Sequence, residues 1–155
     1  MKKKLLLIVI FYFALIISSY GAASSGSSRS SNYDKGATII KKGKKLEEKG
    51  KIEKANKRYE KAFEYLIKSN KETPNQPDTL NYLGYASRKL GNFEVAEKYY
   101  LEGLKIKPDH KGINEYLGEL YIITNRTNLA KERLEVLKNC NCEEYDELKE
   151  LIEKN

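Results

Sequence analysis

The sequence predicts an all-α protein made of three helix-turn-helix repeats and a C-terminal capping helix. First, apolar residues recur with helical spacing from Tyr33 onward, and no alternating β-branched run or Asn-Gly or Asp-Gly hairpin signal interrupts them. Second, the chain matches itself at an offset of 34 residues, which places Leu83-Gly84 on Leu117-Gly118 and Ala96 on Ala130. A fixed period of this length is typical of stacked helical repeats.

The N-terminus has the three parts of a signal peptide. Lys2, Lys3 and Lys4 are followed by an apolar run of thirteen residues, Leu5 to Ile17, and then by mostly small residues. The run is shorter than the roughly 20 residues of a membrane-spanning helix. We therefore expect a signal peptide over residues 1–23, cleaved after Ala23 or after Gly21. An uncleaved anchor is the alternative, and either would place the rest of the chain in the periplasm or otherwise outside the cytoplasm.

The composition excludes some partners. Residues 24–32 are rich in Ser and Gly, which predicts a flexible linker. Without the three N-terminal lysines the formal net charge falls from +7 to +4. Lys and Glu alternate along the predicted helices, as solvated faces do, whereas a nucleic-acid-binding protein would cluster Lys and Arg on one face. We expect no nucleic-acid binding, and membrane contact only through an uncleaved N-terminal segment.

The second repeat, residues 77–110, carries the most regular pattern. Small residues stand where two helices must touch, and Pro108 ends the second helix, after which Asp109 can cap the next one. The third repeat, residues 111–142, repeats the pattern without its Pro. The shared positions are Leu80, Leu83-Gly84, Ala96, Tyr100, Gly103 and Pro108 in the second repeat, and Leu117-Gly118, Tyr121, Ala130, Leu134 and Leu137 in the third.

These positions and their spacing resemble the tetratricopeptide repeat. The departures are Ser87, where an aromatic residue is usual, and Asn114 and Cys142, which stand at the usual Trp and Pro sites of the third repeat. The resemblance implies a short right-handed superhelix. It also implies that the first helix of each repeat lines a concave groove, which binds a peptide or a partner helix.

The first repeat, about residues 36–76, allows two alignments. An offset of 34 matches Gly50 to Gly84, whereas an offset of 41 matches Gly50 to Gly91. The offset of 41 is favoured because it places Gly50 in a turn and leaves the apolar stripe of residues 52–67 in one helix. The second helix of this repeat should then be about two turns longer than usual. We expect helices near residues 34–48, 52–70, 78–90, 93–106, 111–123 and 127–138.

A seventh helix is expected within residues 143–155. Asn141 can cap it, with Glu144 three residues later as in a capping box. Because stacked repeats leave their last apolar surface open, a helix that covers this surface is needed for solubility.

The residues offer little for catalysis. His110 is the only histidine, so a His-based catalytic triad or zinc site is not available, and no Gly-rich phosphate loop is present. We expect no enzyme activity, no cofactor and no metal. Cys140 and Cys142 are the exception, because thiols tend to oxidise in exported proteins. They could form a structural disulfide, stay as inert thiols, bridge two molecules, or carry metal or redox chemistry.

Cys142-Glu143-Glu144-Tyr145 resembles the end of small exported bacterial tetratricopeptide proteins, and this resemblance implies a local disulfide. The groove that the resemblance implies would present Asn81, Tyr85 and Arg88 from the second repeat, Glu115 and Glu119 from the third, and Lys44 from the first. Tyr85 and Tyr116 could instead pack between helices. A chaperone-tail receptor is rejected, because Ile40 and Lys44 stand where the family's carboxylate clamp has Lys and Asn.

The leading functional hypothesis is an exported, non-enzymatic adaptor that binds a peptide or protein segment in its concave groove. The first alternative is a homo-oligomeric structural envelope protein, such as a homodimer paired through the long helix near residues 52–70. A thiol-redox protein using Cys140 and Cys142 is the remaining alternative.

Overall fold

The computed structural model describes residues 31–155, and all regular elements within this range are helices, which confirms the predicted all-α class. The helices are α1 (Ser31–Glu47), α2 (Ile52–Glu72), α3 (Pro77–Lys89), α4 (Phe93–Ile106), α5 (Lys111–Ile123), α6 (Thr127–Leu137) and α7 (Glu143–Glu153). The predicted signal peptide and residues 24–30 of the predicted linker lie outside the described residues, and Ser31 and Asn32 already belong to α1. Between residues 31 and 155, no helix is both long and apolar enough to span a bilayer.

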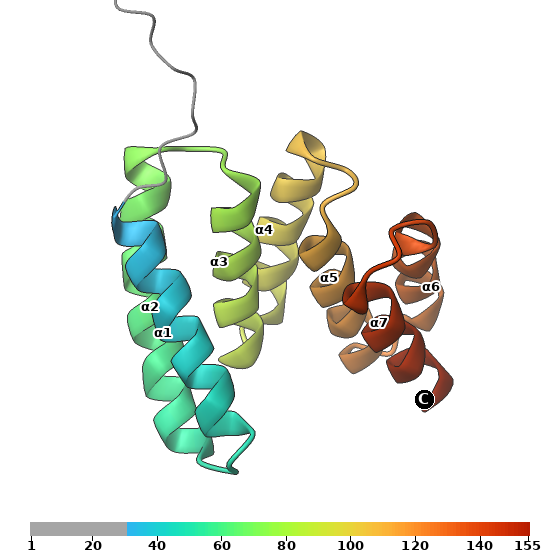
Figure 1. The fold of residues 1–155 in the computed structure, drawn as a ribbon, viewed down its shortest axis with the longest axis horizontal. Helices are drawn as coiled ribbons and strands as arrows, with labels where there is room; N and C mark the ends of the chain where they lie inside the picture. The colour runs from blue at the N-terminus through green and yellow to red at the C-terminus, as the bar shows by residue number, and fades with distance from the viewer. Residues whose placement is uncertain (1–30) are drawn as a thin grey trace, which may run out of the picture.

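The helices form three antiparallel pairs that stack side by side, as Figure 1 shows. α1 packs on α2, α3 on α4 and α5 on α6, while α2–α3 and α4–α5 contacts join successive pairs. α7 packs against both α5 and α6 at the end of the stack. This is the arrangement that the repeat pattern predicts.

The first pair has the long second helix that the offset of 41 predicts. α2 contains 21 residues, whereas α4 contains 14 and α6 contains 11. Gly50 lies in the turn before α2 with φ of +67°, just as Gly91 lies in the turn before α4 with φ of +79°. The apolar stripe of α2, which includes Tyr59, Ala62 and Leu66, is buried within the chain.

The two helices of a pair meet where a glycine faces a tyrosine. A Cβ atom on Gly84 of α3 would lie 2.4 Å from Cε1 of Tyr100 on α4, and Gly43 has the same relation to Tyr59. The third pair differs, because a Cβ on Gly118 would lie 2.5 Å from Cδ2 of Leu148 on α7. The seventh helix therefore supplies the large side chain that the second helix supplies in the other two pairs.

Two helix caps differ from their predictions. His110, not Asp109, caps α5, since its Nδ1 accepts a hydrogen bond from the Ile113 amide at 3.2 Å. Cys142, not Asn141, is the N-cap of α7, and it makes no side-chain capping hydrogen bond. Asn141 adopts a φ of +44° between the two cysteines, which removes it from the N-cap position and leaves the expected capping box unformed.

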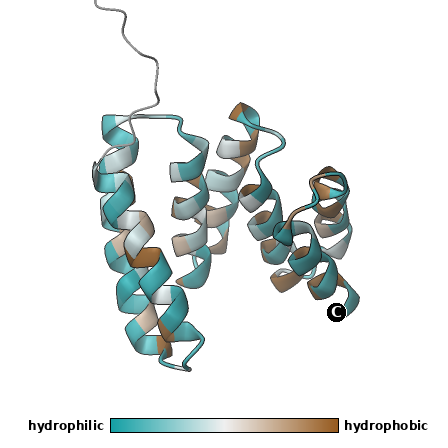
Figure 2. Ribbon diagram, in the orientation of Figure 1, coloured by the Kyte–Doolittle hydropathy of each residue, from teal (hydrophilic) through white to brown (hydrophobic). Residues whose placement is uncertain are grey.

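The buried side chains form two clusters that meet at the middle of the stack. One cluster lies among α1, α2 and α3, and the other among α4, α5 and α6. Tyr116 of α5 is packed against both clusters. Figure 2 shows that hydrophilic residues predominate along the α1–α2 pair, with apolar residues in scattered positions on the ribbon.

We expect Gly84→Ala to destabilise the fold, because the added methyl group would overlap the fully buried ring of Tyr100. Overpacking of this kind typically costs about 1–3 kcal/mol. The midpoint of urea unfolding should fall accordingly. Lys98→Ala, at an exposed position of α4, is the control and should change the free energy of unfolding by less than about 0.5 kcal/mol. Equal midpoints for the two variants would contradict the close contact.

Candidate interaction site on the first helices

The six residues predicted for the groove lie on α1, α3 and α5, the first helices of the three pairs. Four of them are more buried than expected: Asn81 is 8% exposed, Tyr85 3%, Arg88 5% and Glu115 3%. The expectation of an exposed stripe is therefore wrong for these four, because side chains from neighbouring helices cover them. Lys44 and Glu119 remain partly exposed. We call this surface of α1, α3 and α5 the first-helix face.

Tyr85 lies at the centre of an aromatic cluster. Its ring meets the edge of Tyr59 at a centroid distance of 5.8 Å and the ring of Tyr116 at 4.9 Å. The Nζ of Lys44 lies 4.8 Å from the Tyr85 centroid and 4.9 Å from that of Tyr116, and it donates a 2.7 Å hydrogen bond to the Tyr116 hydroxyl. Cation–π contacts and this hydrogen bond therefore connect α1 to α3 and α5. Of the two roles considered for Tyr85 and Tyr116, the structure shows packing between helices.

Arg88 and Glu119 form an ion pair across α3 and α5, with 2.6 Å between Nη1 and Oε2. The guanidinium is almost fully buried, whereas the Glu119 side chain is 25% exposed. The buried hydroxyl of Tyr100 lies next to this guanidinium. Burial alone would lower the pKa of Arg88, but the interaction with Tyr100 and the charge of Glu119 keep this pKa above its usual value. Removing either member of a buried ion pair leaves an uncompensated charge, so Arg88 and Glu119 depend on each other.

A second ion pair links α1 to α3. Oε1 of Glu47 lies 2.6 Å from Nζ of Lys89, and its Oε2 accepts a 2.5 Å hydrogen bond from the Tyr59 hydroxyl. Burial alone would raise the pKa of Glu47, but the hydrogen bonds from Lys89 and Tyr59 outweigh burial and hold this pKa below its usual value. The side chains of Glu47 and Lys89 are 34% and 23% exposed, so both remain within reach of a partner.

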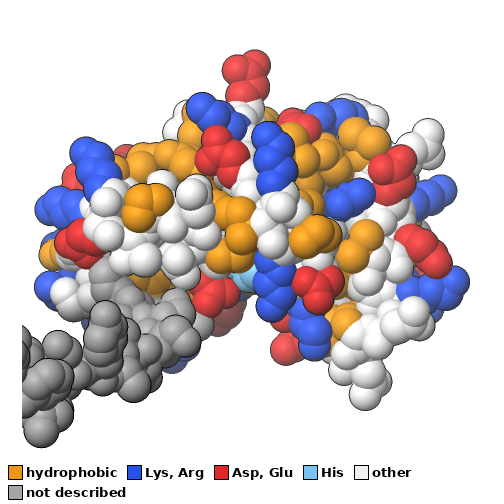
Figure 3. Space-filling view, turned by 90° about the horizontal axis from the view of Figure 1, so that it is seen from above, with side chains coloured by type: hydrophobic (Ala, Val, Ile, Leu, Met, Phe, Trp, Pro, Cys, Tyr) orange, Lys and Arg blue, Asp and Glu red, His pale blue; other side chains and the backbone are white. Residues whose placement is uncertain are grey.

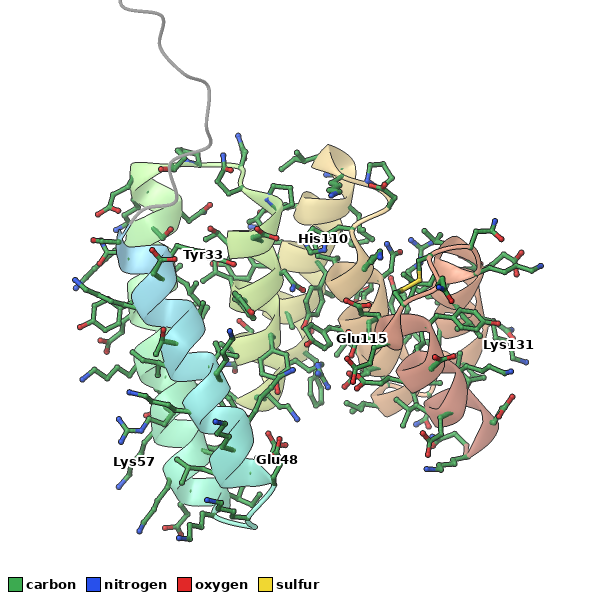
Figure 4. All side chains as sticks on the ribbon, viewed as in Figure 1. Tyr33, Glu48, Lys57, His110, Glu115 and Lys131 are labelled. Carbon is green, nitrogen blue, oxygen red and sulfur yellow. A yellow bond between two sulfur atoms is a disulfide. The ribbon has the colours of Figure 1, made fainter. Side chains whose placement is uncertain are left out.

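Glu115 is a buried carboxyl group on the side of α5 that faces α7, as Figure 4 shows. Burial, followed by a hydrogen bond with Glu147 of α7 and the negative charge of Glu119, raises the pKa of Glu115 to about 10. The positive charge of Lys44 opposes this shift only in part. Glu115 is therefore protonated at neutral pH and joins α5 to α7 without a buried charge.

The first-helix face offers charged groups of both signs to a binding partner. Its accessible polar groups are two amines and two carboxylates, from Lys44, Lys89, Glu47 and Glu119, on a base of buried tyrosines. Figure 3 shows charges of both signs and apolar side chains intermingled on the upper surface of the molecule. No group of three His, Cys, Asp or Glu side chains within residues 31–155 is arranged to hold a metal ion.

Cys140 and Cys142 form a disulfide between the end of α6 and the start of α7. Among the alternatives from the sequence, the structure thus has a bridge within one chain. The first turn of α7 also carries Glu143, Glu144 and Asp146, whose negative charges would oppose a thiolate at Cys142. This arrangement fits a structural link better than a reactive thiol.

Sequence reasoning placed Glu47 on the groove side of the first repeat but did not identify Lys89 or Glu147. Both belong to this network through contacts with helices distant in sequence. The repeat pattern did contain a signal for Lys89, which directly follows Arg88 on the same end of α3. Nothing in the sequence indicated that Glu147 would meet Glu115, because that contact depends on how α7 folds back onto α5.

Comparisons with known proteins agree with this architecture. The family model for the tetratricopeptide repeat matches residues 77–110, the α3–α4 pair. The first tetratricopeptide domain of Spaghetti (RPAP3), solved bound to the HSP90 peptide SRMEEVD, is 22% identical and superimposes with a TM-score of 0.56 over 79% of this chain and 94% of that one. The first such domain of human RPAP3 is 20% identical, with a TM-score of 0.58 over 78% of this chain and 92% of that one.

A human relative, protein O-mannosyl-transferase TMTC3, is 30% identical over 81 residues, which are 52% of this chain. The match spans only 9% of the length of that relative. The α3–α4 pair is thus similar in sequence to a tetratricopeptide repeat, and the fold of the described residues is that of tetratricopeptide-repeat proteins.

We expect Glu115→Gln to flatten the pH dependence of stability. The folded chain binds the Glu115 proton up to a pKa of about 10, while an unfolded Glu releases its proton near its ordinary pKa of 4.5. The folded state therefore holds more protons between these values, and the free energy of unfolding should fall as pH rises through this window. At pH 9, the free energy of unfolding of Glu115→Gln should therefore be higher than that of the unmodified chain by more than ~1 kcal/mol. Urea unfolding at several pH values measures this difference in the free energy of unfolding. Glu132→Gln, at an exposed position, is the control and should follow the pH profile of the unmodified chain. A profile of Glu115→Gln that runs parallel to that of the unmodified chain would contradict the raised pKa.

The disulfide predicts that the purified chain, unfolded without reductant, has no thiol that reacts with a colorimetric thiol reagent. Replacing both cysteines with Ser should lower the free energy of unfolding by about 1.5 kcal/mol at most, because the closed loop is very short. Two reactive thiols in the unmodified chain would contradict the bridge. A covalent dimer that dissociates on reduction would show that the cysteines join two molecules instead.

Proposed function

We propose that this protein is an exported, non-enzymatic adaptor that binds a segment of another protein on its first-helix face. The observation that carries this proposal is the row of Lys44, Glu47, Lys89 and Glu119, which are partly exposed on three different helices. Each of these side chains is already oriented by a contact with a buried partner. Binding groups fixed in this way lose little conformational entropy when a ligand arrives.

The predicted site residues take two roles in this proposal. Lys44 and Glu119 contact the partner directly, because part of each side chain is exposed. Asn81, Tyr85, Arg88 and Glu115 lie beneath the surface and hold those groups in place. The mixed charge favours a partner segment with both acidic and basic side chains. A purely acidic segment would be repelled by the two carboxylates of the row, and a purely basic one by its two amines.

The comparisons support the class of ligand and leave its identity open. The solved Spaghetti domain is bound to a peptide of HSP90, and a domain of the same fold offers the same kind of surface here. In this chain, Ile40 is 1% exposed, and Lys44 already donates a hydrogen bond to Tyr116. Neither residue reproduces the carboxylate clamp, so we propose a ligand other than a chaperone tail. The proposed export rests on the N-terminal sequence over residues 1–23.

The structure offers no apolar surface on α2 for the homo-oligomeric alternative within residues 31–155. That alternative required an apolar surface on the long helix α2, but Ala55, Tyr59, Ala62 and Leu66 are all buried inside the chain. Ile52 is the one large apolar side chain of α2 that is strongly exposed, at 52%. A single exposed apolar residue is normal for a monomer.

The proposal predicts that photo-crosslinking amino acids on the first-helix face capture a partner in native cells. Glu48 of the α1–α2 turn, Lys89 of α3 and Ile123 of α5 are at least partly exposed and occupy equivalent repeat positions. Crosslinkers at these positions of the full chain should yield the same protein adduct. Lys98 on α4 and Glu132 on α6, both exposed on second helices, are matched controls and should yield none.

Mass spectrometry of the adducts identifies the partner and the crosslinked peptide. Crosslinks to unrelated proteins at each position, or the same adduct from first and second helices, would contradict a binding face on α1, α3 and α5. Localisation of the tagged full chain by cell fractionation tests the export proposal separately.

A further inference from the structure

Charge is unevenly distributed along the described chain. Residues 31–72, which contain the first helical pair, hold 13 Lys and Arg against 7 Asp and Glu. Residues 73–155 hold 12 Lys and Arg against 15 Asp and Glu. The first pair is therefore strongly basic and the rest of the described chain is mildly acidic. The mixed surface expected from the sequence holds for the average of the chain but not for this end.

The basic side chains of the first pair converge on one open cavity of ≈ 370 Å³ between α1 and α2. Its lining consists of four cations, two hydroxyl-bearing side chains, one acid and one aliphatic residue: Lys35, Lys42, Arg58, Lys61, Thr38, Tyr65, Asp34 and Ile39. Within residues 31–155, none of the four cationic side chains takes part in an ion pair. Among the lining residues, Asp34 supplies the one carboxylate opposite these four positive charges.

Within residues 31–155, no other helix covers the outer side of the α1–α2 pair, where this cavity lies. Gly36 and Gly43 mark the side of α1 that packs on α2, and Lys44 marks the side that reaches α3 and α5. Helical spacing puts Lys35, Lys42 and Thr38 on the remaining, outward side. Figure 4 shows nitrogen-tipped side chains along this edge of the α1–α2 pair, with Lys57 labelled on α2.

More basic residues extend the cavity into a broad surface. Lys68 and Lys35 both approach the ring of Tyr65, at 5.6 and 5.9 Å from its centroid. Lys45 and Lys54 are exposed, and Lys45 lies three residues after Lys42, while Lys54 lies four residues before Arg58. One small anion would occupy the cavity and leave these outer charges without a partner. An extended anionic surface would neutralise both the positive charges in the cavity and those around it.

A second copy of this chain is the less suitable occupant. The acidic face it would offer is α7, but two of its carboxylates are already in ion pairs with lysines of the same helix, Glu150 with Lys154 and Glu153 with Lys149. Within residues 31–155, no Lys or Arg of α1 or α2 takes part in an ion pair. An anion supplied by a non-protein surface therefore matches the observed charges better.

We propose that the outward face of α1 and α2 binds the surface of a membrane that contains anionic phospholipids. The headgroup phosphates meet Lys35, Lys42, Arg58 and Lys61 in the cavity, and Thr38 donates a hydrogen bond to one of them. The apolar run of residues 5–17 places a membrane-directed segment close to this pair in the sequence. The proposed export decides only which cellular membrane the protein would meet. The vesicle experiment below does not depend on export.

The experiment measures binding of the full chain to lipid vesicles by co-sedimentation. The test variant carries Lys35→Gln, Lys42→Gln, Arg58→Gln and Lys61→Gln. The control carries Lys98→Gln, Lys105→Gln, Lys107→Gln and Lys131→Gln, which remove the same charge from exposed positions elsewhere. Both retain residues 1–30, so any insertion of the apolar run is common to all three proteins. Circular dichroism checks that each is folded.

With vesicles of phosphatidylglycerol and phosphatidylcholine at low salt, the test variant should bind on the order of 100-fold more weakly than the unmodified chain. The control should lose less than about 5-fold, because its changes lie away from the cavity. High salt should reduce the binding of the unmodified chain to the level of the test variant. On pure phosphatidylcholine the three proteins should bind equally.

Three results would overturn the proposal. Equal losses for the test variant and the control would mean that only net charge matters. Saturable binding of inorganic phosphate, seen in amide chemical shifts of Thr38 and Lys42 and as tight as vesicle binding, would indicate a site for a free anion. Self-association of the unmodified chain in light scattering, lost in the test variant, would assign the basic end to a second copy. Failure of the crosslinking experiment on the first-helix face would leave this result unaffected.

Discussion

The contact between a glycine of the first helix and a tyrosine of the second is the constraint on which the structure depends. Tyr59 against Gly43 and Tyr100 against Gly84 set how closely the helices of two pairs approach. Tyr59 also extends into the polar network of the first-helix face, since its hydroxyl donates to Glu47, which in turn binds Lys89. One side chain thus closes a pair and orients a group of the candidate site. The packing of the fold and the geometry of the site cannot be changed independently.

Burial gives the first-helix face its rigidity. The rings of Tyr85 and Tyr116, the ammonium group of Lys44 and the Arg88–Glu119 pair lock three successive first helices to one another. Desolvation of the charged groups opposes this arrangement, and the pairing of each charge compensates for it. The protonated Glu115 serves the same purpose at the junction with α7, where a charged carboxylate would be costly. A surface built in this way presents its groups in one arrangement.

The two ends of the stack differ in chemistry as well as in shape. At one end, α7 covers the third pair and inserts Leu148 against Gly118. At the other end, no helix within the described chain covers the outer side of α1 and α2, and four cations without an ion pair in that part of the chain line the cavity between them. A stack of repeats needs polar ends for solubility, which accounts for charged residues there but not for one sign of charge in excess. Because the proposed protein-binding face and the proposed membrane-binding end lie on different sides of the stack, the protein could bind a partner and a membrane at the same time.

Sequence patterns are enough to predict the helices and their pairing, and also which glycines lie in turns and which lie where two helices meet. Periodicity located α2 as one long helix and Gly50 in a turn, because backbone and side-chain preferences act over a few neighbouring residues. The tertiary structure alone decided which side chains meet: Lys44 covers Tyr85, Glu147 covers Glu115, and the Cys140–Cys142 loop moves Asn141 away from the start of α7. It also brought Lys35 and Lys42 of α1 together with Arg58 and Lys61 of α2 around one cavity. These outcomes depend on helix rotation and on contacts between residues far apart in sequence, and repeat spacing does not specify them.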